Sequence, residues 1–373
     1  MEKKVIVAGH ICLDITPVFP QIRVDQVSDI LIPGKLIQVG EADVHTGGAV
    51  ANTGLAMKIL GADVTLMGKI GGDAFGAMVQ SVLKQYQARC RMIVSEQEST
   101  SYTVALAMPG IDRIFLHNPG ANDTFTCEDM DFSEVEKADM FHFGYPPIMK
   151  KMYEDGGSEL EKLYRKVKES DTVTSLDLAA VDEKSAAGGA DWEAILRRVL
   201  PYVDFFVPSV EELCFMLDRP RYDEWTRRAA GGDMTEVIDT DDVAPLAQKI
   251  LDMGVKVALI KCGAPGMYYK TAGSGKIGGL CKRLGLAVEE WADKEGFEES
   301  FVPERILSGT GAGDTSIAAF LTSVLRGTGL AEAVQMAAAT GACCVAAYDS
   351  LSGLKPLEDL KKKIEGGWEK SKR

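Results

Sequence analysis

Apolar runs typical of β-strands alternate with amphipathic stretches typical of helices along most of the chain. The predicted strands lie at residues 5–9, 64–71, 140–144, 172–178, 204–209 and 257–263. The predicted helices between them lie at residues 49–60, 74–86, 159–170, 192–201 and 242–254. Regular alternation of strands and helices indicates a parallel sheet with helices on both faces. The sequence therefore predicts an α/β fold with a doubly wound, mostly parallel sheet flanked by helices.

Two segments interrupt this alternation and predict a small second sheet. Residues 100–118 contain two β-rich runs around a Pro-Gly turn, which is the pattern of an antiparallel hairpin. Residues 22–40 are also extended and contain their own Pro-Gly turn. We expect lid strands from approximately 15–45 and 98–120, which could exclude water from a reaction. Two surface hairpins without a gating role would fit the same pattern.

The chain carries no internal repeat or low-complexity linker, so we expect a single domain over residues 1–373. The segment 270–303 is interpreted as an insertion. Its acidic part, residues 289–300, is interpreted as a solvated stretch without chemistry of its own.

The composition is that of a globular protein with an acidic charge balance. Of the 373 residues, 46% are hydrophobic and 26% are charged, and 41 Lys and Arg against 55 Asp and Glu give a net charge of −14. This balance argues against nucleic acid or an anionic membrane surface as a partner. It is compatible with a small anionic ligand, which a single loop can bind. The first apolar run is interpreted as a strand rather than a signal peptide, and no run has the length of a membrane span, so we expect a cytoplasmic protein.

The cysteines and histidines suggest no metal site. The eight cysteines include no C-x-x-C pair, and reduced, buried thiols fit this chain better than a disulfide framework. The histidines are scattered and are interpreted as ordinary packing or surface residues: His10, His45, His117 and His142.

The stretch GTGAGDTSIAAF, residues 309–320, combines closely spaced glycines with an acid just ahead of a predicted helix. The helical pattern begins at Thr315, and Gly327 ends it. Backbone N–H groups at a helix N-terminus lack intrahelical partners and lie at the positive end of the helix dipole. Gly311, Ala312 and Gly313 therefore form a candidate anion site that a phosphate can approach closely.

Asp314, at the rim of this loop, has two interpretations. It could cap the helix, or it could accept the proton of a hydroxyl that attacks a bound phosphate. The loop alone favours neither. Phosphoryl transfer explains better why an acid adjoins an anion site, because the attacking hydroxyl and the transferred phosphorus must lie in line.

Two other phosphate-binding motifs do not fit the sequence. The glycine loop lacks the G-x-G-x-x-G spacing of a dinucleotide fingerprint. A Walker A loop ending in the Gly-Lys pair at 275–276 would need a glycine at Lys270 and a Ser or Thr at Ile277.

A second stretch, residues 45–76, contains a Gly-Gly pair, an asparagine four residues further on and a G-x-D-x-x-G ending. This stretch and the glycine loop resemble the N-terminal and C-terminal signatures of the ribokinase-like (PfkB) carbohydrate kinase family. The likeness extends over nearly the whole chain and includes the α/β alternation and the lid hairpins. It implies ATP-dependent phosphorylation of a hydroxyl on a sugar or sugar-like alcohol.

The resemblance also implies roles for individual residues. Asp314 matches the catalytic base, and the anion hole matches Gly311, Ala312 and Gly313. The substrate-binding positions match Asp14, Gly47, Gly48 and Asn52. The nucleotide loop matches the stretch KCGAPG at 261–266, and the implied nucleotide-binding residues are Lys261, Gly263, Gly266 and Thr310. Glu212 matches the acid that organises Mg²⁺ through water, with Ser209 in the usual asparagine position. Without the family, Asn52 and Glu212 would be interpreted as helix-surface residues.

Two departures and two alternatives limit what the resemblance implies. Ser308 stands where relatives that bind a monovalent cation often have Asp, which argues against such activation. Ala49 replaces the lysine typical of ribokinases, which argues against assuming ribose. A nucleoside kinase or a non-catalytic sugar-binding protein would share the signatures. Because lid strands in this family commonly pair between subunits, we also expect a homodimer.

Overall fold

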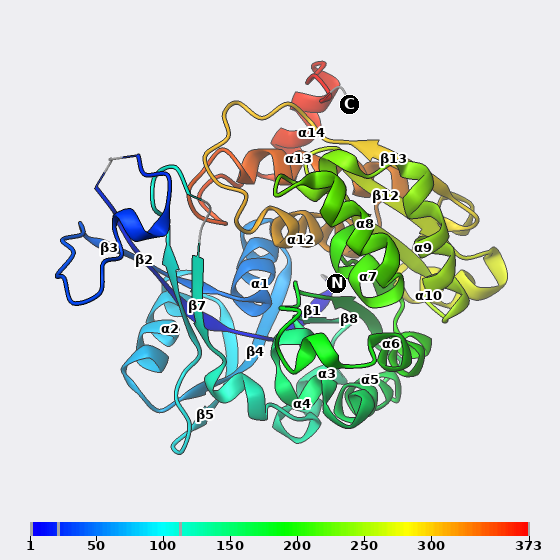
Figure 1. The fold of residues 1–373 in the computed structure, drawn as a ribbon. Coiled ribbons are helices and arrows are strands. Elements are labelled where there is room, and N and C mark those ends of the chain that lie inside the picture. Colours follow the sequence, from blue (N-terminus) through cyan, green and yellow to red (C-terminus); the bar gives the residue numbers. More distant parts are fainter. Residues whose placement is uncertain (1–2, 21–22, 112–113, 372–373) are drawn as a thin grey trace.

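The computed structural model describes residues 3–20, 23–111 and 114–371, and within them the largest sheet has nine strands (Figure 1). The strand order is β13-β12-β11-β10-β9-β8-β1-β4-β5. All pairs from β11 to β5 are parallel, whereas β12 and β13 add antiparallel strands at one edge. The bounds are β1 (Lys4–Gly9), β4 (Asp63–Gly71), β5 (Arg89–Ser95), β8 (Met140–Gly144), β9 (Val173–Asp177), β10 (Phe205–Phe206), β11 (Val257–Lys261), β12 (Gly266–Thr271) and β13 (Glu295–Glu299).

Helices cover both faces of this sheet because its strands are apolar on both sides. In β1, Val5 and Val7 join one buried cluster, whereas Ile6 and Ala8 join the other. The first cluster packs against α1 (Ala49–Ile59), α2 (Ala74–Gln85), α10 (Ser274–Leu284), α11 (Val288–Trp291), α12 (Ala312–Leu325), α13 (Leu330–Cys344) and α14 (Leu357–Glu365). The second packs against α3 (Phe132–Val135), α4 (Lys150–Tyr153), α5 (Ser158–Lys168), α6 (Trp192–Val199), α7 (Val210–Leu217), α8 (Arg219–Ala229) and α9 (Thr240–Asp252). The predicted doubly wound α/β fold is confirmed.

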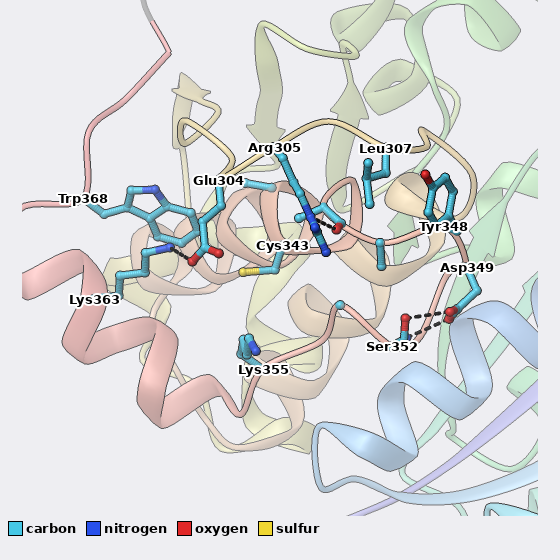
Figure 2. Close-up of a pocket in the computed structure, with 14 residues that line it drawn as sticks. Glu304, Arg305, Leu307, Cys343, Tyr348, Asp349, Ser352, Lys355, Lys363 and Trp368 are labelled. Atoms are coloured by element: carbon cyan, nitrogen blue, oxygen red, sulfur yellow. Dashed lines mark hydrogen bonds and ion pairs between the residues drawn. The ribbon is translucent and has the colours of Figure 1, made fainter.

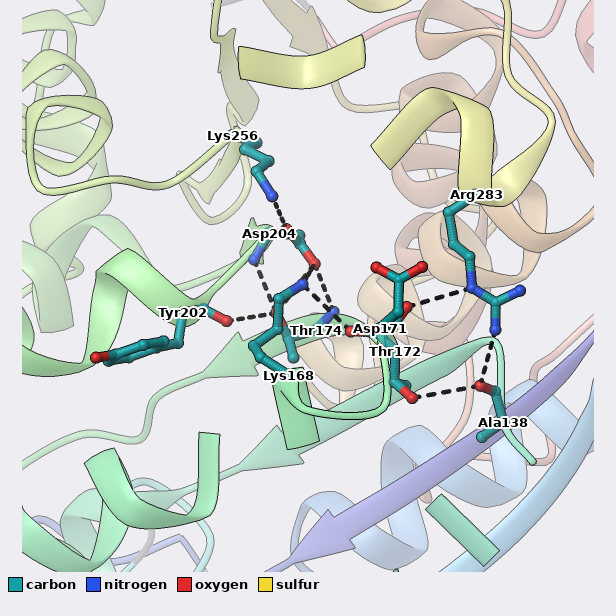
Figure 3. Close-up of polar contacts among 9 residues, drawn as sticks. All are labelled: Ala138, Lys168, Asp171, Thr172, Thr174, Tyr202, Asp204, Lys256 and Arg283. Atoms are coloured by element: carbon teal, nitrogen blue, oxygen red, sulfur yellow. Dashed lines mark hydrogen bonds and ion pairs between the residues drawn. The ribbon is translucent and has the colours of Figure 1, made fainter. Parts of the chain in front are cut away.

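A buried carboxylate ties together the amino ends of three central strands (Figure 3). Asp204 is 1% exposed, and its carboxylate accepts hydrogen bonds from the Lys168 ammonium at 2.7 Å and from the ammonium of Lys256. It also accepts bonds from the backbone N–H and the hydroxyl of Thr174, at 2.9 and 3.1 Å. Burial alone would raise the pKa of Asp204, but the two ammonium groups outweigh burial and lower it. This carboxylate is satisfied and ionised.

A second, four-stranded sheet lies apart from the main one, with the order β3-β2-β6-β7 (Figure 1). Its strands are β2 (Cys12–Pro17), β3 (Ala42–Gly47), β6 (Tyr102–Leu106) and β7 (Ile114–Asn118). The antiparallel pairing of β6 with β7 confirms the hairpin predicted at 100–118. We call this sheet the lid sheet below.

Three details of the sequence prediction are wrong. Of the segment 22–40, residue 22 lies outside the described residues and residues 23–40 form no strand; β2 precedes this segment, β3 follows it, and its only described helix is a short 3₁₀ turn, Val27–Asp29. The helix after the glycine loop begins at Ala312 rather than Thr315, so the loop's last residues form its first turn. The acidic stretch 289–300 is not a solvated insertion, because β13 pairs with β12 and Trp291 is fully buried.

Candidate active site

The candidate site lies where the central parallel strands end. Asp177 and Lys261 are the last residues of β9 and β11, and Tyr145 directly follows β8. Asp314 lies in the first turn of α12, which enters from another part of the sequence. The crevice at the carboxyl ends of parallel strands is the usual ligand site of open α/β sheets.

Asp314 is not a helix cap. The cap position is Gly311, and the carboxylate of Asp314, which is 5% exposed, makes its hydrogen bonds to other elements. Its Oδ2 accepts from Asn52 Nδ2 at 3.1 Å, and its Oδ1 accepts from Thr53 Oγ1 at 3.3 Å. The Tyr145 hydroxyl lies 2.8 Å from both oxygens. The side chain is therefore fixed in place by residues of α1 and by the segment after β8.

The pKa of Asp314 is raised by burial. The Lys261 ammonium and the hydrogen bonds from Tyr145, Asn52 and Thr53 oppose this rise. A carboxylate whose proton affinity exceeds that of an ordinary aspartate, but which is held by hydrogen-bond donors, is suited to accept a proton.

Asn52 positions Asp314 instead of presenting a free amide. It is 9% exposed, so it is no helix-surface residue, and its Oδ1 accepts a hydrogen bond from Ser350 Oγ at 3.0 Å. Both polar atoms of the amide are thus engaged. The family resemblance implied a substrate-binding role for Asn52, and its contact with Asp314 was not predicted from the sequence.

The glycine loop is shaped by close packing at one position and is open at others. Gly311 has a left-handed φ of 75°, and a side chain there would meet Ser350 Cβ at 2.2 Å. Gly309 has no neighbour within 4 Å of such a side chain, and Gly313 faces only the Lys261 side chain, at 3.4 Å or more. Within the described part of the chain, the backbone N–H groups of Gly311 and Gly313 donate to no protein acceptor. The loop therefore has free donors and space beside a lysine.

Lys261 lies beside this loop, and three carboxylates act on its charge: those of Asp177, Glu212 and Asp314. Its ammonium lies 2.8 Å from Oδ1 of Asp177, which is 1% exposed. The second oxygen of that carboxylate has no hydrogen-bond partner among the described residues. Burial raises the pKa of Asp177, and the negative charges of Glu212 and Asp314 add to the rise. The cluster thus has more negative charge than its single lysine offsets.

Asp14 lies in β2 of the lid sheet. It pairs in register with His45 of β3 and Thr103 of β6, and a side chain at Gly47 would meet its carboxylate at 2.0 Å. Burial raises its pKa, while hydrogen bonds from Cys12 and Thr103 oppose the rise. Position 47 must therefore be glycine to leave space for the Asp14 carboxylate. Two of the predicted substrate-binding residues, Asp14 and Gly47, thus lie against each other.

His10 connects the lid sheet to Asp314. Its ring centroid lies 5.3 Å from that of His117 and 6.1 Å from that of Tyr145, and Gly48, at a φ of 83°, packs against its Nδ1. Burial lowers the pKa of His10 to about 3, so the ring is neutral. Neither of its buried nitrogens has a hydrogen-bond partner among the described residues. The histidine is thus no ordinary packing residue, since unpaired buried polar atoms are uncommon.

The predicted nucleotide residues have partly structural explanations. Gly263, at a φ of 66°, packs against Thr235, and a side chain at Gly266 would meet the Glu298 carbonyl oxygen at 2.1 Å. Ser209 and Glu212 form a capping box at the start of α7, with Ser209 N donating to Glu212 Oε2 at 2.8 Å. Thr310 is exposed, and its N–H donates to Ser308 Oγ at 3.1 Å. The charge of Asp177 and, after it, that of Glu212 raise the pKa of Lys261 against the effect of burial. Glu212, the predicted metal position, therefore lies close to this lysine.

Two cavities of the described structure are lined by other residues than those of this site. Figure 2 shows a cavity of about 410 Å³ between residues 304–307, the end of α13 and the segment leading to α14. Another, of about 560 Å³, lies at the start of α10. None of the predicted site residues lines either cavity. The candidate site is defined by the chemistry of its side chains.

Tyr145, Asp177, Thr53 and the two nitrogens of His10, which have no partner among the described residues, were not predicted from the sequence. Tyr145 and Asp177 had a usable signal, because each is a polar residue at the end of a predicted buried strand. The others are visible only when α1, α12 and the lid sheet are placed together. Among the described residues, no three His, Cys, Asp or Glu side chains are grouped so as to hold a metal ion.

Comparison with known proteins identifies the family. Residues 3–355 match the pfkB family carbohydrate kinase family. An uncharacterized sugar kinase of Archaeoglobus fulgidus is 21% identical over 300 residues, covering 80% of this chain and 98% of that protein. The structure of Arabidopsis thaliana ribokinase complexed with ribose and ATP has a TM-score of 0.72 and 18% identity, covering 98% of this chain and 99% of that one. The nucleoside kinase of Methanocaldococcus jannaschii has a TM-score of 0.64 and 18% identity, covering 98% and 100%.

The chain belongs to the pfkB family of carbohydrate kinases. The structural likenesses, at low identity, establish the ribokinase-like fold with its lid sheet. The protein is a sugar kinase of this family. None of the helices in the described ranges is long and apolar enough to cross a bilayer.

Proposed function

We propose that this kinase transfers the γ-phosphoryl group of ATP to a hydroxyl of a sugar or sugar-like alcohol, with Asp314 as the base. The observation that carries the proposal is the position of Asp314. It adjoins free N–H donors and Lys261 on one side and, through Tyr145 and His10, the polar residues of the lid sheet on the other. An acid between an anion site and a hydroxyl-binding surface has the arrangement that phosphoryl transfer requires.

In the proposed reaction, Asp14 binds hydroxyls of the acceptor, and the neutral His10 ring offers one donor and one acceptor to another hydroxyl. Asp314 accepts the proton of the attacking hydroxyl as its oxygen bonds to the γ-phosphorus. The bond from that phosphorus to the bridging oxygen breaks, and ADP leaves. The N–H groups of Gly311 and Gly313, with Lys261, stabilise the charge on the transferred group.

The nucleotide is expected to bring Mg²⁺, and the residues present fit that ion. The unpaired oxygen of Asp177 and the surplus negative charge around Lys261 would be stabilised by a divalent cation. Glu212 has one carboxylate oxygen outside its capping box and would act through water. When bound, Mg²⁺ neutralises phosphate charge. Thr310, Gly263 and Gly266 remain proposed nucleotide contacts.

The lid sheet is proposed to pair with that of a second copy. Large apolar side chains are exposed on or next to it, including Leu36 at 94%, Phe115 at 57% and Leu116 at 54%. Exposed apolar groups gathered on one element are typical of an interface. Light scattering after size exclusion tests this, and a monomer at micromolar concentration would contradict it.

Asp314→Asn tests the proposed function. The amide keeps the shape and can keep the hydrogen bonds from Tyr145 and Thr53, but it cannot accept the proton. We expect a normally folded protein with near-normal sugar binding and turnover lowered by about three orders of magnitude or more. The measurement is ADP release with a panel of sugars, sugar phosphates and nucleosides. Near-normal turnover would remove Asp314 from the mechanism, and activity with nucleosides alone would assign the substrate to that class.

A further inference from the structure

Tyr145 has a strained backbone at the centre of the site. Its φ of 70° and ψ of 38° lie in the left-handed region, which a bulky residue rarely adopts, and two prolines follow it. Such a conformation costs on the order of 1–3 kcal/mol and persists where the surroundings enforce it. The Tyr145 N–H donates to the carbonyl oxygen of Asp177 at 3.4 Å, which anchors the residue to the end of β9.

This conformation brings the Tyr145 hydroxyl to the Asp314 carboxylate. The phenolic oxygen lies 2.8 Å from both Oδ1 and Oδ2, closer than the other two donors, Asn52 and Thr53. The two carboxylate oxygens together offer about four acceptor positions. The three donor groups leave about one acceptor position open, and one position is enough to accept the hydrogen of an attacking hydroxyl.

Resting on the proposed role of Asp314 as base, we propose that Tyr145 is a positioning residue. Its hydroxyl fixes the orientation of the carboxylate and favours the ionised form that receives the proton of the acceptor hydroxyl.

The groups around the contact support this role. Burial and the charges of Asp314 and Asp177 raise the pKa of Tyr145 well above that of an ordinary phenol, so its hydroxyl remains a donor. Glu212 of α7 acts in the same direction, and the Cys344 thiol of α13, whose pKa burial raises to about 11, is neutral. The neutral His10 ring lies on the lid side. Lys261 is the cation on β11 that, like Tyr145, favours the ionised form of Asp314.

If Tyr145 had a purely structural role, removing its hydroxyl would have the same kinds of effect as removing the hydroxyl of Tyr164. Tyr145 is half-buried and Tyr164 is buried; the Tyr164 hydroxyl also donates at 2.8 Å, but to the Ser175 carbonyl oxygen, which does not titrate. Tyr164→Phe is therefore a matched control for Tyr145→Phe. Each variant removes one phenolic hydrogen-bond donor. Only in Tyr145→Phe is the acceptor that loses this donor the proposed base, Asp314.

The kinetic test compares the pH profiles of the two variants. We expect Tyr145→Phe to lower kcat about tenfold, the loss typical of a hydrogen bond to a charged group, with KM for sugar and ATP changed less than about twofold. The acidic limb of its kcat/KM profile should move to higher pH, because a carboxylate that loses a donor is more easily protonated. Tyr164→Phe should leave this limb in place. An unmoved limb in Tyr145→Phe, or an equal shift in both variants, would overturn the proposal.

A stability cycle tests the contact without using activity. Tyr145→Phe is combined with Asp314→Asn, and denaturant midpoints are measured for the four proteins at neutral pH. We expect Tyr145→Phe to cost more in the wild-type background than in the Asp314→Asn background, because the charged acceptor gains more from the donor. If Asp314→Asn is inactive and no coupling is found, the Tyr145 proposal alone fails. If Asp314→Asn retains turnover, the proposed function fails, and the positioning role fails with it.

Discussion

Two buried aspartates lie at opposite ends of the same central strands, and their surroundings differ. Asp204, at the amino ends, accepts hydrogen bonds from two lysines and from Thr174 (Figure 3), and its pKa is lowered. Asp177, at the carboxyl ends, has one lysine and two further carboxylates nearby, one of its oxygens has no partner within residues 3–20, 23–111 and 114–371, and its pKa is raised.

The difference separates a structural cluster, around Asp204, from a cluster with unsatisfied charge, around Asp177, which we call the poised cluster. Around Asp204, charge is balanced within the protein, so nothing more is needed to complete it. Around Asp177, Lys261 and Asp314, the protein leaves negative charge and free N–H donors that a metal-bound phosphate would satisfy. Such unsatisfied groups cost stability in the ligand-free protein and are expected where function requires them.

The largest expected effect on stability is at the structural cluster. Asp204→Asn leaves Lys168 and Lys256 without a counter-charge, although both lysines still reach water. We expect the free energy of unfolding to fall by about 3 kcal/mol, the lower end for breaking a buried ion pair. Asp177→Asn, the matched change, should alter it by less than about 1 kcal/mol because it removes an incompletely paired charge. Urea denaturation measures both, and equal losses would contradict the distinction.

The next largest effect is on turnover at the poised cluster. Lys261→Met removes the cation beside the glycine loop, and we expect kcat to fall about a hundredfold, as for the loss of one charge-stabilising donor. Lys256→Met removes a lysine that is also paired with a buried aspartate, from the other cluster, and should lower stability while leaving kcat within about twofold. Steady-state kinetics measures kcat for both variants. An equal loss of turnover in the two would contradict the assignment of Lys261 to the site of phosphoryl transfer.

A smaller effect is expected on the pH dependence of stability. Because the folded pKa of Asp204 is lowered, this residue stabilises the protein above the ordinary carboxyl pKa, and the contribution is lost as pH falls through the folded pKa. The difference in unfolding free energy between wild type and Asp204→Asn should therefore shrink as pH falls below about 5.

Asp177 should show the opposite trend. Its raised folded pKa means that its ionisation destabilises the protein as pH rises above the ordinary carboxyl value. Asp177→Asn should thus become relatively more stable with rising pH. Chemical denaturation from about pH 3 to about pH 8, the raised pKa of Asp177, measures both trends, and parallel curves for the two variants would refute the contrast.

The sequence by itself determined the fold and the position of the proposed chemistry. Apolar runs at strand length and amphipathic helices specify a two-faced sheet through local patterning, so β1, β8 and α1 form where they were predicted. The glycine loop and Asp314 are adjacent in the chain, so their spacing could be seen directly. Details that depend on pairing, such as the lid strands flanking residues 23–40 and the burial of Trp291, could not be predicted, because they depend on distant partners.

Only the tertiary structure decided which side chains serve Asp314. Asn52 is 262 positions away from it in sequence and Tyr145 is 169, and no periodicity reports contacts at such separations. The same holds for the two aspartates. Asp177 is the last residue of β9, and Asp204 directly precedes β10. They differ because Asp204 contacts two lysines, whereas Asp177 shares one lysine with two other carboxylates. The charge balance around each aspartate depends on which charged side chains the packing places within a few ångströms of it. The order of residues along the chain does not specify these neighbours.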